Sequence, residues 1–213
     1  MALIDQEQRR RAKKTRGERK ERVKQAARTT FLKRPYPDIT LENIGGRAKV
    51  EGGIVSMFYG SREELFLVIL QDEMEAWLDE LDERLPRIRA VKGAAKALGD
   101  LLGERADLAR LLGTLPTVME IGGGTDGAVR FGRWHSERVG ATGAHLARRL
   151  DGLSRDGAAR VLLRLQLIAG GLFPGLASAS GLAGAGPVDL PAELTLLAGC
   201  LLAAEIDSEV ARP

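Results

Sequence analysis

The sequence has little cysteine and few aromatic residues, and both shortages narrow what the protein can be. Among 213 residues there is one cysteine, Cys200, which excludes an intramolecular disulfide and a cysteine-based zinc cluster. Cys200 lies in the apolar segment LTLLAGCLLAAE, which predicts a buried structural thiol rather than a nucleophile. Aromatic residues make up only 4% of the chain, so the core must be built from Leu, Ala, Val and Ile.

Strand patterns are lacking as well. No segment sustains the alternation of apolar and polar residues that marks a β-strand, and there is no internal repeat. Apolar residues instead recur with helical spacing, and the abundant Leu and Ala are strong helix formers. The sequence therefore predicts an all-α protein.

Signatures of catalysis and metal binding are also missing. There is no HExxH or GxSxG motif, and the glycine-rich stretches GGGTDG and GLAGAG do not join a strand to a helix, as a phosphate-binding loop would. His135 and His145 are ten residues apart on one predicted helix, about 80° out of register, which disfavours a two-histidine metal site. We expect no enzyme activity, no cofactor and no metal.

What the chain does have is an uneven distribution of charge. Residues 1–34 hold thirteen Lys or Arg against four acids, a net charge of +9, so the rest of the chain carries −6. A basic end on an acidic body suggests a polyanionic partner at that end. Nucleic acid, an anionic membrane or a solvated tail would each explain it, although the lack of interleaved aromatic residues disfavours single-strand binding.

Two segments bear on membranes and targeting. The first residues, MALIDQEQRRRAKK, contain no apolar core of a secretory signal, so a cytoplasmic location is expected. Residues 165–188 are uncharged and long enough to span a bilayer, but Pro174 and several glycines interrupt them. A buried helix to about Phe173, followed by a flexible Gly/Ala/Ser loop, is the better interpretation, and no membrane partner is expected.

Residues 18–66 form a distinctive series of short helical patterns. An amphipathic helix is predicted from Glu18 to about Lys33, and Pro35 and Pro37 then prevent its continuation. Thr40 is a suitable N-cap for a helix of about eight residues, and a second short helix follows from Gly52. Helices this short need packing to persist. The residues placed to form a shared core are Phe31, Ile44, Val55 and Leu65.

Such a helix pair has a known physical use. The first helix braces against the DNA backbone, while the second presents its N-terminal residues to the major groove, where Gly52 and Gly53 would permit close approach. A helical hairpin that serves only for packing would show the same spacing. The basic leader favours the DNA-binding interpretation.

The stretch ERVKQAARTTFLKRPYPDITLENIGGRAKVEGGIVSMFYGSREELF resembles the N-terminal domain of the TetR family of bacterial repressors. The resemblance covers about 50 residues without a gap. It rests on an Ala-Ala pair followed by Phe31, then Tyr36, Thr40, Ile44, Arg47-Ala48-x-Val50, Gly53, Tyr59 and Ser61-Arg62-Glu63-Glu64-Leu65.

The chain also departs from the family pattern. Lys49 stands where the family usually has Gly, and Glu51 and Gly52 replace the usual Ser and the frequent Lys. Ser56 takes the place of a common phosphate-binding Tyr, and Met57 that of a frequent His. We therefore expect an unusual operator, with phosphate contacts made by other residues, including the basic arm 9–20.

The resemblance implies a homodimeric transcriptional regulator, a repressor released from a palindromic operator in double-stranded DNA by a small-molecule effector. The implied domains are a basic flexible arm (1–17), a helix-turn-helix DNA-binding domain (18–62) and a helical effector-binding and dimerisation domain (63–213). The candidate DNA contacts are Thr40, Arg47, Lys49, Glu51, Gly52, Gly53, Ser56, Met57, Tyr59 and Arg62.

Beyond residue 86 the patterns are all helical. Helices are predicted over 87–102, over 105–119 with a bend or break at Leu115-Pro116, and over 129–150, 154–173 and 191–206, with a loop at 122–127. The resemblance implies that the last two helices dimerise and that the middle helices enclose an effector pocket. The candidate interface residues are Leu163, Leu167, Leu194, Leu197 and Leu201, and the candidate pocket residues are Trp77, Met119, Phe131, Trp134 and His135.

Two other functions fit the same features. One is a helical protein that binds an anionic membrane or another polyanion through its basic tail. The other is a helical small-molecule-binding protein with no operator.

Overall fold

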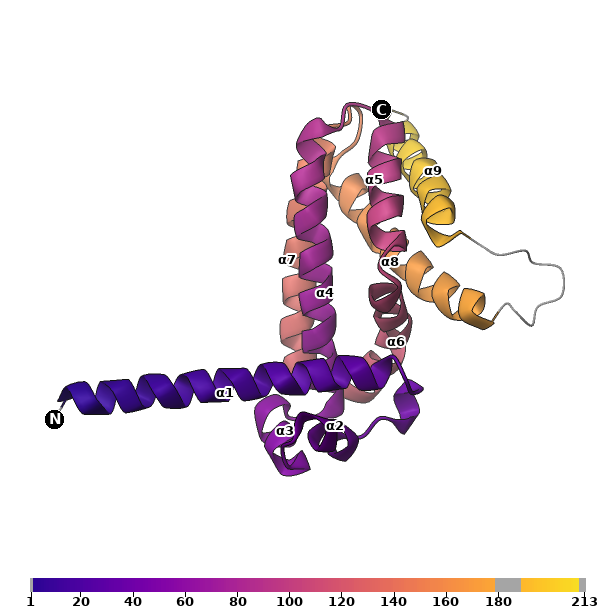
Figure 1. Cartoon of the computed structure of the whole chain (residues 1–213). Coiled ribbons are helices and arrows are strands. Elements are labelled where there is room, and N and C mark those ends of the chain that lie inside the picture. The colour runs from indigo at the N-terminus through magenta and orange to yellow at the C-terminus, as the bar shows by residue number, and fades with distance from the viewer. Residues whose placement is uncertain (1, 179–188, 211–213) are drawn as a thin grey trace. The chain divides into compact units, whose positions relative to one another are not determined.

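The computed structural model describes residues 2–178 and 189–210, and every regular element in these ranges is helical (Figure 1). The predicted all-α class is confirmed. None of the helices in the described ranges combines the length and the apolar character needed to cross a bilayer. The chain divides into an N-terminal unit, Met1–Ile69, and a C-terminal unit, Leu70–Pro213. This division lies inside one helix, α4 (Arg62–Arg84), a few residues beyond the predicted boundary at 62/63.

The N-terminal unit is a small bundle of short helices packed on the end of a long one. Its elements are α1 (Ala2–Phe31), the 3-10 helix η1 (Tyr36–Asp38), α2 (Leu41–Ala48), α3 (Gly52–Tyr59) and the first two turns of α4. The four residues predicted to share a core, Phe31, Ile44, Val55 and Leu65, are all buried. Phe66 joins them, and its ring centroid lies 5.4 Å from that of Phe31.

The basic leader differs from the prediction. The sequence predicts a flexible arm over residues 1–17 and a helix only from Glu18, whereas α1 is helical from Ala2. The leader is rich in Arg, Lys, Gln, Glu and Ala, which all favour helix, and it has no proline before Pro35. The basic composition of the leader therefore did not predict whether it is helical or flexible.

The C-terminal unit contains the remainder of α4 and five further α-helices. These are α5 (Val91–Gly103), α6 (Ala106–Gly122), α7 (Asp126–Ala147), α8 (Arg155–Ser178) and α9 (Leu190–Val210), with the 3-10 helix η2 (Leu85–Arg87) after α4. Its largest fully buried side chains include Trp77, Leu78, Leu81, Leu98 and Leu101. The core is thus mainly aliphatic, with the rings of Trp77 and Phe131 buried in it.

Two glycines bring α5 unusually close to α9. A Cβ added at Gly103 would lie 2.5 Å from the Cα of Pro191, and one added at Gly99 would overlap the backbone of Thr195. Any side chain at either position would push the two helices apart. At these positions the backbone of α5 therefore packs directly against the backbone of α9.

Several element boundaries differ from the prediction. α6 continues through Pro116 without a break. α7 begins at Asp126 because Thr125 caps it, its hydroxyl accepting from the Ala128 amide at 3.2 Å, so the predicted loop at 122–127 is shorter. α8 extends to Ser178, into the expected Gly/Ala/Ser loop, and the rest of that loop, 179–188, lies outside the described residues.

Cys200 is also placed differently. It is exposed on α9 rather than buried. Four residues earlier on the same helix, Leu196 is 63% exposed, so the outward stripe of α9 passes through the cysteine. The prediction of burial relied on apolar neighbours in the sequence, and several of these lie on the opposite, buried face of the helix.

Candidate nucleic-acid interface

The first helix of the predicted DNA-binding pair is capped at its start by a reciprocal pair of hydrogen bonds. The Asn43 amide donates to Thr40 Oγ1 at 3.2 Å, and the Thr40 amide donates to Asn43 Oδ1 at 3.3 Å. Such a capping box fixes the first turn of α2. The Thr40 hydroxyl accepts in this bond and also donates to the Glu42 carboxylate. The Glu42 backbone amide first and this hydroxyl second lower the pKa of that carboxyl.

The turn between α2 and α3 depends on one residue in the left-handed region. Lys49 has φ 57°, and its amide donates to the carbonyls of Gly45 and Gly46. The sequence resemblance implies a Gly at this position, and Gly adopts such a φ without steric cost. Lys49 keeps the turn geometry despite its side chain, and that side chain is exposed.

α3 presents a small, uncharged face to solvent. Val55 and Tyr59 are buried, while Gly53, Ser56 and Met57 are exposed, Met57 to 66%. A Cβ added at Gly53 would meet no atom within 4 Å, so nothing inside the chain requires a glycine there. Ser56 donates its hydroxyl to the Gly60 carbonyl at 3.1 Å. This face can enter a groove closely but brings no cation with it.

Most of the predicted DNA contacts are solvent-accessible. The exposed members of the set are Thr40, Arg47, Lys49, Glu51, Gly53, Ser56 and Met57, and Gly52 begins α3. Glu51 is the N-cap residue of α3, but its carboxylate does not bond to the amides of the first turn. It therefore remains free to meet either a phosphate, which it would repel, or a cytosine amino group.

Two predicted contacts serve the interior of the unit instead. Tyr59 is 9% exposed, and its hydroxyl donates to the Lys20 carbonyl at 3.0 Å. The Arg62 guanidinium donates to the Ile39 carbonyl at 2.8 Å and to Glu63 Oε1 at 2.8 Å. Both were expected to face DNA, and both use their polar groups within the fold.

Arg62 forms a partly buried cluster with Tyr36 and Glu63. Its guanidinium lies over the Tyr36 ring at 4.4 Å, and the Tyr36 hydroxyl donates to Glu63 Oε1 at 3.2 Å. Burial, followed by the Glu63 charge, raises the pKa of Tyr36 well above its ordinary value. Burial acts to raise the pKa of Glu63, but its hydrogen bonds, including those from Arg62, leave that pKa lowered. The cluster locks η1 and the entry to α2.

The contacts between α1 and α3 could not be predicted from the sequence. The Lys20 ammonium lies 5.6 Å from the Tyr59 ring centroid, and the Arg16 guanidinium lies 5.8 Å from that of Phe58. These cation–π contacts place basic side chains of the leader directly beside α3. They are possible only because the leader is helical as far back as Arg16.

The predicted effector-pocket residues lie in the C-terminal unit, several of them on α7. Phe131 is buried and stacks on His135 with ring centroids 5.9 Å apart. His135 Nε2 lies 2.8 Å from the Oε1 of Gln166, a buried residue that the sequence did not single out. Met119 is half-buried and Trp77 fully buried. In the described part of the chain, Trp77 Nε1 and Gln166 Nε2 lack a hydrogen-bond partner.

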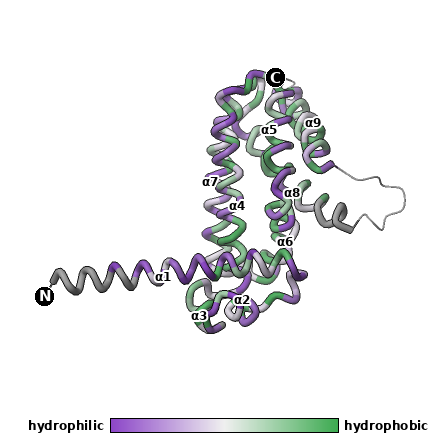
Figure 2. The backbone as a smooth tube through the Cα atoms, in the orientation of Figure 1, coloured by the Kyte–Doolittle hydropathy of each residue, from purple (hydrophilic) through white to green (hydrophobic). Residues whose placement is uncertain are grey.

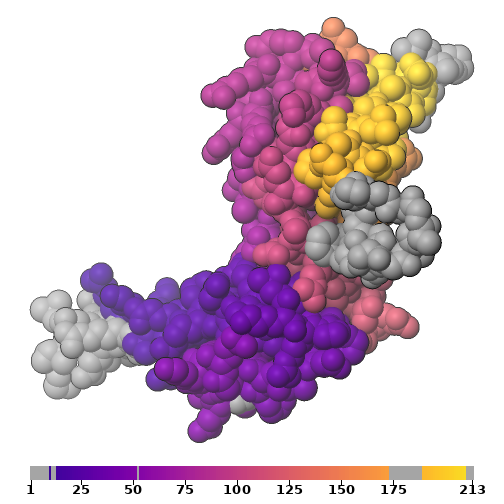
Figure 3. All heavy atoms as spheres, turned by 45° about the vertical axis from the view of Figure 1, so that its right-hand side comes forward, coloured from indigo at the N-terminus to yellow at the C-terminus, as the bar shows by residue number. Residues whose placement is uncertain are grey.

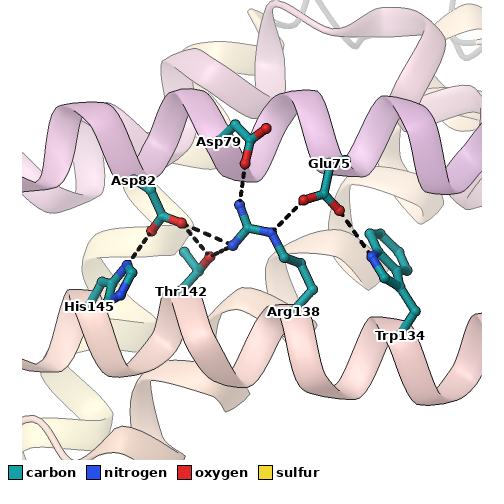
Figure 4. Close-up of polar contacts among 7 residues, drawn as sticks. All are labelled: Glu75, Asp79, Asp82, Trp134, Arg138, Thr142 and His145. Atoms are coloured by element: carbon teal, nitrogen blue, oxygen red, sulfur yellow. Dashed lines mark hydrogen bonds and ion pairs between the residues drawn. The ribbon is translucent and has the colours of Figure 1, made fainter.

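An ion cluster joins α7 to α4 in the same unit (Figure 4). The Arg138 guanidinium contacts Glu75 Oε1 at 3.0 Å, Asp79 Oδ1 at 2.7 Å and Asp82 Oδ2 at 2.9 Å. Burial disfavours the charge, but the carboxylates, led by Asp82, raise the pKa of Arg138 above its ordinary value. The outer members of the cluster are Trp134, Thr142 and His145, which bond to these carboxylates. The indole N–H of Trp134 is therefore already hydrogen-bonded to the Glu75 carboxylate.

The predicted dimer residues fall into two groups. Leu163 and Leu167 are 43% and 64% exposed on α8, and Leu197 and Leu201 are half-exposed on α9. Leu194 is fully buried within the chain, so it has no surface to offer a second copy. Leu196, which the prediction did not include, is 63% exposed on α9. α9 lies at the surface of its unit, where Figure 3 shows it in yellow.

Comparison with known proteins gives one family match. The family model for the tetracyclin repressor-like C-terminal domain matches residues 71–190, more than half of the chain. The match begins next to the division between the two units. No curated protein matches the sequence significantly.

Solved structures resemble the chain over most of its length. A crystal structure of a proposed TetR-family transcriptional regulator from Mesorhizobium loti MAFF303099 has a TM-score of 0.52 and 18% identity, covering 91% of this chain and 97% of that one. The fatty acid degradation regulator FadR from Bacillus halodurans has a TM-score of 0.50 and 15% identity, covering 86% and 94%. At such low identity these likenesses establish the fold.

Proposed function

The chain belongs to the TetR family of transcriptional regulators, and we propose that it is a cytoplasmic repressor that binds a palindromic DNA operator as a homodimer and is released by a small-molecule effector. The observation that carries the DNA-binding part is the exposed face of α3. Gly53, Ser56 and Met57 stand outward on a helix whose entry is fixed by the Thr40 capping box and the Lys49 turn. A helix so presented fits the major groove.

Dimerisation is supported by the apolar surface of α8 and α9. Leu163, Leu167 and Leu196 are among the few large apolar side chains left exposed in the described residues. A second copy would cover them and bring two α3 helices to one duplex. We expect Leu167→Glu to yield monomers in sedimentation and to lose operator binding, whereas Val129→Glu, at a 54% exposed site on α7, keeps both.

The effector part is supported by two buried donors in the C-terminal unit. Trp77 Nε1 and Gln166 Nε2 are buried, and an unpaired buried N–H costs about 1–3 kcal/mol. An effector with hydrogen-bond acceptors would satisfy them. Such a ligand shifts DNA affinity only through its different affinities for the DNA-bound and free conformations.

Selection of bound duplexes from a random pool, at low and moderate salt, tests the proposal. A palindromic consensus that survives moderate salt supports both the operator and the dimer. Binding that is independent of sequence, accompanied by equal or tighter binding to anionic vesicles, would favour the membrane or polyanion alternative. Recovery of no duplex from a protein that still binds small molecules would favour a ligand-binding protein without an operator.

A single variant tests whether α3 enters the groove. Gly53→Glu adds a negative charge at the exposed start of α3 without any clash inside the chain, so the fold should persist while DNA binding is lost. Gly132→Glu is the matched control, because it is also an exposed helical glycine with open space around it. Retained operator binding in the Gly53 variant would contradict the docking.

A further inference from the structure

The α2–α3 hairpin does not supply the charge that DNA binding requires. Residues 40–60 contain two cations, Arg47 and Lys49, and two anions, Glu42 and Glu51, so their net charge is zero. Affinity for duplex DNA depends on neutralising phosphates with Lys and Arg. Residues 10–24, in contrast, hold nine Lys or Arg and two Glu, a net charge of +7. Most of the positive charge near α3 therefore lies on α1.

Three of the cations of α1 lie on the side that faces α3. Helical spacing places Arg16, Arg19 and Lys20 seven, four and three residues before the buried Val23, on the same face of the helix. That face is apolar where it packs on the core and cationic farther toward the N-terminus. Figure 2 shows that the residues of α1 are mostly hydrophilic before the helix reaches α2 and α3.

The two helices enclose a groove of about 470 Å³. Its lining is made of Thr15, Arg16 and Arg19 from α1 and Ile54, Met57 and Phe58 from α3. One wall is therefore cationic and the other apolar. Arg16 is held in place over the Phe58 ring, at 5.8 Å from its centroid. A ligand that fits both walls has an anionic edge and a less polar edge.

We propose that this groove seats the sugar–phosphate backbone of one DNA strand, with phosphates on Arg16 and Arg19 and deoxyribose against Ile54, Met57 and Phe58. The inference rests on the proposed function, because it takes α3 to lie in the major groove. Met57 connects the two surfaces, since it lines the groove and is also exposed on the outer face of α3. Arginine suits this role because its planar guanidinium binds phosphate oxygens in pairs.

The rigid form of the leader matters for this contact. A helix advances about 1.5 Å per residue, so α1 carries its charges along a straight path past α3. A flexible arm would lose conformational freedom when it ordered on DNA, whereas a preformed helix loses little. The leader thus acts as a second, sequence-independent DNA-binding element beside the base-contacting helix.

The test compares Arg16→Gln/Arg19→Gln with the wild-type full chain on the duplex selected by the wild type. Gln keeps the helical propensity of Arg, and both sites are exposed, so circular dichroism should be unchanged. We expect affinity to fall on the order of 10- to 100-fold, and the salt slope of log K to fall by about 1.8, with the selected consensus unchanged. Arg148→Gln/Arg149→Gln, two exposed arginines of the C-terminal unit, is the control of equal charge change.

A second measurement identifies the contact itself. Each operator phosphate is replaced in turn by a neutral methylphosphonate, and each duplex is tested against both proteins. At one or two positions the wild type should lose affinity while the double variant loses none. Arg16→Lys/Arg19→Lys should restore the salt slope and part of the affinity, because it keeps the charge without the paired geometry.

Three results would overturn the inference. The first is a double variant with wild-type affinity and salt slope, which would leave the regulator function intact. The second is equal loss by both proteins at every neutralised phosphate, which would mean that the arginines do not contact the backbone. The third is failure of the wild-type protein to bind any duplex, which would remove the proposed function as well.

Discussion

Arg62 holds the carbonyl of Ile39 at 2.8 Å, across 23 residues of sequence. The bond joins the first turn of α4 to the residue just before the Thr40 cap of α2. Ile39 itself is fully buried. The position of α2, and through it that of α3, is therefore set from α4 by a guanidinium that points into the fold.

We expect Arg62→Ala to destabilise the N-terminal unit by about 2–3 kcal/mol, since it leaves the buried Glu63 carboxylate without its cation. Both tyrosines of the chain, Tyr36 and Tyr59, lie in this unit, so tyrosine absorbance during urea unfolding monitors it. The salt slope of DNA binding should stay at the wild-type value. A normal stability with a reduced slope would instead mark Arg62 as a phosphate contact.

Replacing Lys49 with Gly should raise the stability of the N-terminal unit and lower its DNA affinity. Its left-handed backbone costs a non-glycine residue about 1 kcal/mol, so Lys49→Gly should raise the unfolding free energy of the N-terminal unit by about 0.5–1 kcal/mol. The same change removes an exposed cation beside α3, so we expect the salt slope of DNA binding to fall by about 0.9.

Lys49→Gln separates the two effects, because it keeps the strained backbone but loses the charge. It should show the reduced slope without the gain in stability. If Lys49→Gly gains stability and binds operator with unchanged salt dependence, Lys49 has no role at the phosphates.

The sequence predicted the short helices well, because their caps and apolar spacing are local signals. Thr40, Ile44 and Val55 all take the positions that spacing alone assigns. The use of Arg62 could not be predicted, since the carbonyls of Tyr36 and Ile39 that it binds lie more than twenty residues away and become its neighbours only on folding. The predicted phosphate contact of Arg62 stays a prediction, and the structure adds bonds of the same side chain within the fold.

The basic leader and the last helix illustrate a second limit. The charged, polar composition predicted a flexible arm over residues 1–17, but charge does not report helicity, and α1 is helical from Ala2. Cys200 lies in a run that is apolar on all sides, so its orientation could not be derived from spacing. Where a helix has no polar face, the sequence alone does not indicate which side turns outward.

Gly103 should tolerate no side chain. A Cβ there would lie 2.5 Å from the Cα of Pro191, which is backbone and cannot move aside cheaply, so Gly103→Ala should cost about 2–4 kcal/mol. Both tryptophans, Trp77 and Trp134, lie in the C-terminal unit, so tryptophan fluorescence follows its unfolding. Gly132→Ala is the control, because an exposed helical glycine with open space should gain about 0.5–1 kcal/mol. Equal effects at both sites would refute the close approach of α5 and α9.

Glu205 should make the stability of the C-terminal unit dependent on pH. It is 5% exposed, and its carboxylate bonds Arg160 at 2.6 Å and Arg164 at 2.7 Å, joining α9 to α8. The hydrogen bond from Arg160, more than any other influence, lowers the pKa of Glu205 below its usual range. Because the folded pKa is below the unfolded value of about 4.3, the stabilisation is fully present above that pH and is lost as the pH falls through the folded pKa.

We therefore expect Glu205→Gln to lower the unfolding free energy by about 2 kcal/mol at pH 7, and the difference from wild type to shrink progressively below about pH 4. Urea titrations followed by tryptophan fluorescence, at one protein concentration from pH 7 to pH 3, give the comparison. Asp207→Asn, at an exposed site two residues away, should show little change at any pH. A Glu205→Gln deficit that stays constant down to pH 3 would mean that shape, rather than the charge held between Arg160 and Arg164, accounts for the contribution of this side chain.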